Sequence, residues 1–181
     1  MKIGFAGTMS VGKTTLVKAL AELDEFKEYF IATERSKYLR DLGIPLNTDS
    51  TLPGQLIFLA ERASEILRDN VLTDRTIWDV CSFTFNAKSI DEHEKYHYIN
   101  AAMCLKDQYD VVFYIGPEGI DIEDNGVRET DAEYRDIIDQ TIVELLETYQ
   151  PKKLIQIKGT TEERIALVLE VFYKYLYANP N

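Results

Sequence analysis

The chain has 181 residues, of which 45% are hydrophobic and 28% charged, so it can build the core of a single folded domain covering residues 1–181. This composition excludes a disordered or collagen-like chain, and no apolar run reaches the length of about 18 residues that a membrane-spanning helix needs. The net charge of −11 disfavours nucleic acids and anionic membranes as partners, because their phosphate groups would be repelled. With no secretory signal and only two cysteines, we expect a cytoplasmic protein.

The first half of the chain alternates between apolar runs and helical patterns. Residues 2–6 and 29–33 are apolar enough for buried strands, and a third strand begins at Val71 and ends at Asp74. Between them, helices are predicted from residue 13 to about residue 23 and, from the spacing of leucines and alanines, over residues 56–67. This alternation favours an α/β fold with a parallel sheet.

The second half continues the same alternation. Helices are predicted around residues 78–85 and 92–105, and strands at residues 111–115 and 154–157. Two capping boxes, in which a threonine precedes a glutamate by three positions, each predict the start of a helix: Thr130 with Glu133, and Thr160 with Glu163.

The strongest chemical signal is a phosphate-binding loop, or P-loop, that follows the first strand and opens the first helix. Residues 7–14 fit the pattern G-x-x-x-x-G-K-[ST] at every fixed position. Glycines let the backbone wrap a phosphate, Lys13 would reach the β- and γ-phosphates of ATP, and the Thr14 hydroxyl would ligate Mg²⁺. The predicted nucleotide-binding residues are Gly7, Thr8, Met9, Ser10, Val11, Gly12, Lys13, Thr14 and Thr15.

Two carboxylate–arginine pairs follow the second and third strands. Ligands of open α/β sheets bind at the carboxyl ends of the strands, so both pairs are candidates for the active site. Asp74 is the candidate acid for Mg²⁺, bound to the ion directly or through a water, and Arg75 beside it is the candidate phosphate clamp. Glu34 is the candidate general base for a hydroxyl acceptor. We assign acceptor binding to Glu34, Arg35 and Asp79.

An acidic window follows the fourth strand and contains two conspicuous arginines. Residues 117–149 hold eleven acidic residues but only Arg128 and Arg135 as bases. Asn125-Gly126 favours a turn, so Arg128 is predicted to lie on a mobile lid of approximately residues 117–135 that closes over the donor phosphates. The alternative is a solvated acidic helix in which each arginine pairs with a neighbouring glutamate.

Together these motifs resemble the nicotinamide-riboside kinase domain of NadR-like proteins and, more widely, the deoxynucleoside and thymidylate kinases. The resemblance rests on the P-loop, the Glu-Arg and Asp-Arg-Thr pairs, the strand at residues 109–115 and the Asp-Asn-Gly-Val-Arg segment. It implies a P-loop kinase sandwich with a five-stranded parallel sheet flanked by helices, ATP as phosphoryl donor, and a nucleoside or nucleotide as acceptor.

A rival motif is H-E-x-x-H at residues 93–97, which on a helix can place two imidazoles on one face for zinc. His93 and His97 are the only histidines, and the Gly and His of the extended form are replaced by Asn100 and Met103. We therefore interpret the motif as a solvated helix face. Nearby aromatic residues could stack a base, although core packing is their commoner role; they are Phe83, Phe85, Tyr96 and Tyr98.

The sequence thus predicts a magnesium-dependent kinase that moves the γ-phosphoryl group of ATP to a small nucleoside-type acceptor, either a nucleoside or nicotinamide riboside. Three alternatives stay open: a nucleoside monophosphate kinase, a kinase of modified bases in DNA, and a P-loop switch that hydrolyses or senses its nucleotide. A guanine-reading Asn-Lys-x-Asp motif is absent, which argues against a GTPase. Glu34-Arg35 suits a hydroxyl or a phosphate acceptor, and the oligomeric state is open, a homodimer included.

Overall fold

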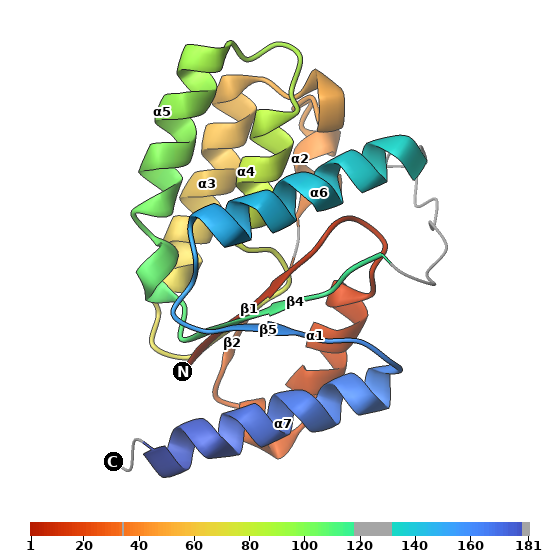
Figure 1. Cartoon of the computed structure of the whole chain (residues 1–181), viewed down its shortest axis with the longest axis vertical. Coiled ribbons are helices and arrows are strands. Elements are labelled where there is room, and N and C mark those ends of the chain that lie inside the picture. The colour runs from red at the N-terminus through yellow and green to blue at the C-terminus, as the bar shows by residue number, and fades with distance from the viewer. Residues whose placement is uncertain (34, 118–131, 179–181) are drawn as a thin grey trace.

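The computed structural model describes residues 1–33, 35–117 and 132–178, and its centre is one parallel sheet (Figure 1). Five strands lie in the order β2-β3-β1-β4-β5. They are β1 (Lys2–Ala6), β2 (Phe30–Ala32), β3 (Val71–Thr73), β4 (Val111–Tyr114) and β5 (Leu154–Gln156). Each lies within one residue of a strand predicted from the sequence, so the α/β class and the five-stranded parallel sheet are confirmed.

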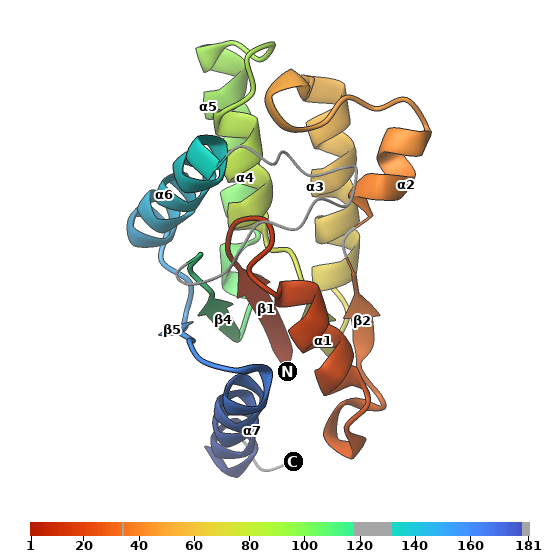
Figure 2. The same ribbon diagram turned by 90° about the vertical axis from the view of Figure 1, so that its right-hand side faces the viewer.

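Helices cover both faces of this sheet (Figures 1 and 2). They are α1 (Lys13–Ala21), α2 (Ser36–Asp41), α3 (Leu52–Ile66), α4 (Ile77–Phe85), α5 (Glu92–Met103), α6 (Ala132–Thr148) and α7 (Thr161–Ala178). Helices α1 and α7 pack on one face, and α3 to α6 pack on the other. The short helix α2 was not predicted. Among the described helices, none combines the length and apolar character that crossing a bilayer would require.

The core consists of two apolar clusters, one on each face of the sheet. Phe5 and Phe113, on the central strands, stack with ring centroids 5.5 Å apart and belong to the cluster under α1 and α7. Trp78 and Tyr109, both fully buried, belong to the cluster under α3 to α6. Because both faces are covered, the central strands are continuous apolar runs without alternation, which made them recognisable in the sequence.

Capping boxes start three of the described helices. At α7 the Thr160 N–H donates to Glu163 Oε2 at 2.7 Å and the Glu163 N–H donates to Thr160 Oγ1 at 3.3 Å, which confirms the prediction. The predicted box at Thr130 lies outside the described residues. Two further boxes were not predicted from the sequence: Thr76 with Asp79 at α4, and Asp91 with Glu94 at α5.

All five strands run in the same direction, so the segments that leave their carboxyl ends meet at one edge of the sheet. Central strand β1 pairs with β3 on one side and β4 on the other. The chain therefore leaves neighbouring strands toward different helices, which opens a crevice at this edge. The candidate site lies there.

Candidate active site

The loop between β1 and α1 has the backbone shape that wraps a phosphate. Its glycines adopt positive φ angles, 149° at Gly7 and 84° at Gly12, and Ser10 between them has a φ of 61°. A Cβ atom at Gly7 would lie 2.3 Å from the carbonyl oxygen of Ile115, which follows β4, so no other residue fits at this position without a backbone shift. Steric space at Gly7 and backbone conformation at Gly12 thus explain why the motif requires glycine at both positions.

Lys13, the first residue of α1, folds back over this loop. Its Nζ donates to the carbonyl oxygens of Gly7 at 2.5 Å and Thr8 at 2.6 Å. The same Nζ lies 3.9 Å from Asp79 Oδ1. The ammonium group is therefore held at the mouth of the loop, where a bound phosphate would meet it.

Thr14 and Asp74, the two residues that the sequence names as magnesium ligands, lie side by side. Thr14 Oγ1 donates to Asp74 Oδ2 at 2.8 Å, and Asp74 directly follows β3 with an exposed fraction of 1%. Hydroxyl and carboxylate oxygens beside a phosphate site are the ligands that Mg²⁺ takes in nucleotide enzymes, with waters and phosphate oxygens completing its shell. The donor set therefore fits magnesium.

Asp79, at the start of α4, contacts the P-loop from the buried side, away from the cavity. Its Oδ1 accepts from the Gly7 N–H at 3.0 Å, and its Oδ2 accepts from the Thr76 N–H at 2.8 Å and from the Thr76 hydroxyl at 2.5 Å. The side chain is 1% exposed and is absent from the lining of the cavity described below. These contacts give Asp79 a positioning role for the loop; none of them supports the acceptor-binding role that the sequence suggested.

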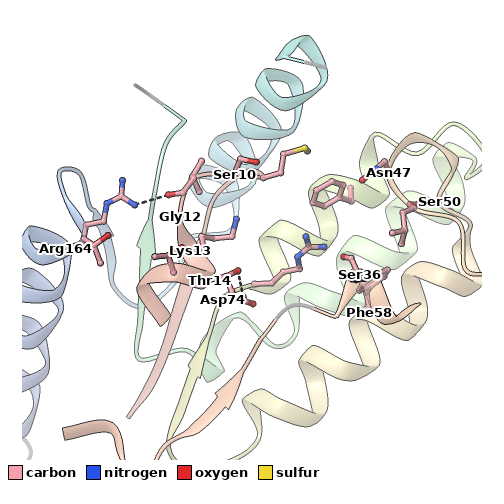
Figure 3. Close-up of a pocket in the computed structure, with 18 of the residues that line it drawn as sticks. Ser10, Gly12, Lys13, Thr14, Ser36, Asn47, Ser50, Phe58, Asp74 and Arg164 are labelled. Atoms are coloured by element: carbon pink, nitrogen blue, oxygen red, sulfur yellow. Dashed lines mark hydrogen bonds between the residues drawn. The ribbon is translucent and has the colours of Figure 1, made fainter. Parts of the chain in front are cut away.

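One cavity of about 420 Å³ extends from the P-loop to α3 and α4 (Figure 3). At one end the P-loop residues from Met9 to Thr15 meet residues 159–161 and Arg164 from the start of α7. The other end is lined by polar and apolar side chains of α2 to α4 and their connecting segments: Ser36, Lys37, Leu46, Asn47, Ser50, Gln55, Phe58 and Phe83. Asp74 and Arg75 also line the cavity, and Figure 3 shows Asp74 beside Thr14, between the two ends.

The structure separates the two arginines that follow β2 and β3. Arg75 lines the cavity, with its guanidinium carbon 5.0 Å from the centre of the Phe83 ring and 5.9 Å from that of Phe58. Arg35 instead pairs with Glu61 of α3 at 3.1 Å and lies over the Tyr38 ring. It is absent from the cavity lining.

Two further predicted site residues, Glu34 and Arg128, lie outside the described residues, as does most of the predicted lid. Their roles stay predictions. Phe83 packs in the core cluster with an exposed fraction of 7% and also lines the cavity, so a role in stacking a base stays a prediction.

Arg164 is a site residue that sequence reasoning missed. Its Nη1 donates to the carbonyl oxygen of Val11 at 2.9 Å, and its Nε donates to that of Gly159 at 3.0 Å. The side chain thereby joins α7 to the P-loop, and partial burial lowers the pKa of its guanidinium without discharging it. The capping box at Thr160 marked this helix start, but no local pattern showed that it faces the P-loop.

Helix α6 also contacts the P-loop. Thr8 Oγ1 donates to the carbonyl oxygen of Arg135 at 3.1 Å, and the Tyr114 hydroxyl donates to Asp139 Oδ2 at 2.9 Å. Burial raises the pKa of Asp139, against the Tyr114 hydrogen bond and the positive charge of Lys13, which lower it. The loop is thus held from α4, α6 and α7 at once.

Comparisons with known proteins agree with this architecture. The sequence matches the family described as AAA domain over residues 2–164. The fold is similar to deoxyadenosine kinase from M. mycoides with the products dCMP and a flexible dCDP bound, with a TM-score of 0.62 and 17% identity over 97% of this chain and 100% of that one. The same kinase with bound dATP gives a TM-score of 0.62 and 18% identity over 96% and 99% of the two chains. No curated protein matches the sequence. The fold is therefore that of the P-loop nucleoside kinases.

Proposed function

We propose that this chain, which belongs to the AAA domain family, is an ATP-dependent kinase that phosphorylates a nucleoside-type small molecule, a nucleoside or nicotinamide riboside. The observation that carries the proposal is a continuous cavity that joins the P-loop to a second compartment lined by α2 to α4. A volume of about 420 Å³ lies within the range of small-molecule sites. A nucleotide switch needs only the compartment at the P-loop, whereas a kinase also needs room for an acceptor beside the γ-phosphate.

The second compartment has the chemistry of a heteroaromatic binding site. Phe58 and Phe83 supply flat apolar surfaces, and Gln55, with an exposed fraction of 3%, brings a buried amide to the same lining. An amide carries a donor and an acceptor side by side, which matches the edge of a nucleobase or of a carboxamide. These features support a nucleoside-type acceptor over a simple sugar or an aliphatic alcohol.

The proposed reaction is in-line attack of an acceptor hydroxyl on the γ-phosphorus of ATP. The new bond joins the acceptor oxygen to phosphorus, the bond to the β–γ bridging oxygen breaks, and ADP leaves. Glu34 takes the hydroxyl proton, while Lys13 and the predicted lid residue Arg128 stabilise charge on the transferring group. Thr14 and Asp74 would hold Mg²⁺, which neutralises phosphate charge when bound. Arg75 orients the acceptor or the transferring phosphoryl group.

The direct test is a transfer screen with ATP labelled in the γ-phosphate. Nucleosides, nicotinamide riboside and nucleoside monophosphates are each incubated with the enzyme, with Mg²⁺ and with EDTA. We expect magnesium-dependent label in a nucleoside-type product. Label only in inorganic phosphate would indicate a hydrolysing switch and overturn the proposal, and label only in diphosphates would indicate a monophosphate kinase.

Glu34→Gln tests the assignment of a hydroxyl acceptor. Glutamine keeps the shape of the side chain but cannot take a proton, so turnover should fall by about 10²- to 10⁴-fold with little change in KM for ATP. Steady-state kinetics on the best acceptor measure both constants. Arg35→Ala is the matched variant, because Arg35 pairs with Glu61 outside the cavity lining. A mild effect of Glu34→Gln together with a raised acceptor KM in Arg35→Ala would favour a phosphate acceptor.

Arg164→Met tests the end of the cavity at the P-loop, where ATP, the phosphoryl donor, is proposed to bind. Methionine keeps part of the stem but cannot bond the carbonyl oxygens of Val11 and Gly159, so the P-loop loses its link to α7. We expect KM for ATP to rise by about tenfold, the equivalent of one strong hydrogen bond to a charged group, while KM for the acceptor stays the same. Lys174→Met, on the exposed end of α7, is the control and should leave both constants unchanged. Equal increases in both KM values would contradict the assignment.

A further inference from the structure

The two histidines of the rival motif lie together on the exposed side of α5, away from the cavity lining. Their Nε2 atoms are 3.0 Å apart, and their ring centroids are 4.3 Å apart. The opposite side of this helix is buried through Tyr98, Ile99 and Ala102. The helix is therefore anchored, and the two rings are presented to solvent by a rigid backbone.

The separation of the two nitrogens fits joint ligation of one metal ion. With metal–nitrogen bonds of about 2.0–2.1 Å, two nitrogens 3.0 Å apart subtend about 95° at the metal. This angle is close to the right angle between neighbouring ligands of an octahedral or tetragonal ion, and smaller than the tetrahedral angle. His93 lies in the first turn of α5, where the capping box of Asp91 and Glu94 holds the backbone in helical form.

The surroundings limit what such an ion could do. Glu94, which would be the general base of an H-E-x-x-H protease, accepts a hydrogen bond from the Asp91 N–H at 3.1 Å, and Glu92 pairs with Lys95 at 2.8 Å. In the described part of the chain, no cluster of three or more histidine, cysteine or acidic side chains is placed to share an ion. An ion held by the two imidazoles would therefore complete its shell with water.

We propose that His93 and His97 form a surface chelate for a divalent transition metal, with Ni²⁺ and Cu²⁺ bound more tightly than Zn²⁺, and Mg²⁺ not bound. Imidazole is a ligand for these borderline ions and not for magnesium, and the ~95° geometry and the general affinity order both favour nickel and copper. The ion would replace the contact between the two Nε2 atoms, each ring then carrying its proton on Nδ1.

The test measures Ni²⁺ binding to the untagged full chain by titration calorimetry in saturating Mg²⁺, which occupies the oxygen ligands of the P-loop site. The background is Cys104→Ser, because that exposed thiol is another soft ligand. We expect one Ni²⁺ per chain, and a loss of affinity of at least about tenfold in His93→Gln and in His97→Gln, since each variant removes one arm of the chelate. Asn100→Ala, on the exposed side of the same helix, is the control and should bind as the parent does.

A second readout uses the fact that the chain has only two histidines. Zn²⁺, which is diamagnetic, should shift the ring signals of both residues together in a proton NMR titration, at one stoichiometry. The proposal would be overturned if either histidine variant bound Ni²⁺ with an affinity within twofold of the parent chain, or if the parent chain showed no saturable binding. Both histidine positions are exposed, so each variant is expected to fold, and an unchanged melting temperature without metal verifies this.

Discussion

Replacing Lys13 by alanine is expected to lower the rate of phosphoryl transfer by about 10³-fold, equivalent to about 4 kcal/mol of transition-state stabilisation. The ammonium group lies at the P-loop mouth, bonded to the Gly7 and Thr8 carbonyl oxygens, where a phosphate held by the loop would meet it. Its loss removes a charge that water cannot replace at the same geometry. Single-turnover kinetics with labelled ATP measure the rate of transfer apart from product release.

Two further variants separate this effect from damage to the loop. Lys13→Met keeps most of the stem and should be as inactive as Lys13→Ala, because the charge is missing in both. Lys18→Ala removes an exposed lysine from the same helix and should keep full activity. If Lys13→Met retained a tenth or more of the parent rate, the assignment of Lys13 as the phosphate ligand would be wrong.

Replacing Asp79 by alanine is expected to cost about 3 kcal/mol or more of folding free energy. The buried carboxylate accepts from the Gly7 N–H and from both donors of Thr76, and alanine would leave these groups without an acceptor at about 1–3 kcal/mol each. It would also remove the capping box of α4. Urea denaturation measures the free energy of unfolding, and equilibrium binding of ATP measures the state of the loop.

Glu94→Ala is the matched control, because Glu94 occupies the same position in the capping box of α5. Its carboxylate is partly exposed and bonds only the start of its own helix, so its loss should cost no more than about 1 kcal/mol and leave ATP binding unchanged. The loss of folding free energy in Asp79→Asn should lie between those of Asp79→Ala and Glu94→Ala, since the asparagine amide oxygen can still accept from the Gly7 N–H. Similar losses in Asp79→Ala and Glu94→Ala would mean that Asp79 does not support the P-loop.

The parts of the site that could be predicted are those formed by residues adjacent in the sequence. The P-loop is one eight-residue motif, and its two glycines have the positive φ angles expected of such a loop because the backbone shape depends on local sequence. The Thr14–Asp74 pair followed from one further rule, that parallel strands end at the same edge. Asp74 directly follows an apolar strand, which fixed its position without knowledge of the helices.

Other parts depend on how helices are oriented on the sheet, which a local pattern does not contain. The sequence assigned Asp79 to the acceptor, but the first turn of α4 directs its carboxylate under Gly7. Gln55 and Arg164 lie on the inner sides of α3 and α7, where only packing against the sheet brings them to the cavity. The hydrophobic periodicity of these helices predicts which face is buried, but it does not identify which residues near that face border a ligand.

The contact between Arg164 and Val11 also concerns the biosynthesis of the protein. The two halves of the donor compartment are separated by about 150 residues of chain, because the P-loop ends at residue 14 and its partners begin at residue 159. At a translation rate of about 5–20 residues per second, the P-loop emerges from the ribosome many seconds before the start of α7. During that interval a chain that carries the whole nucleotide motif has only part of its binding site. Nascent chains of this protein should therefore bind ATP more weakly until α7 has docked against the P-loop.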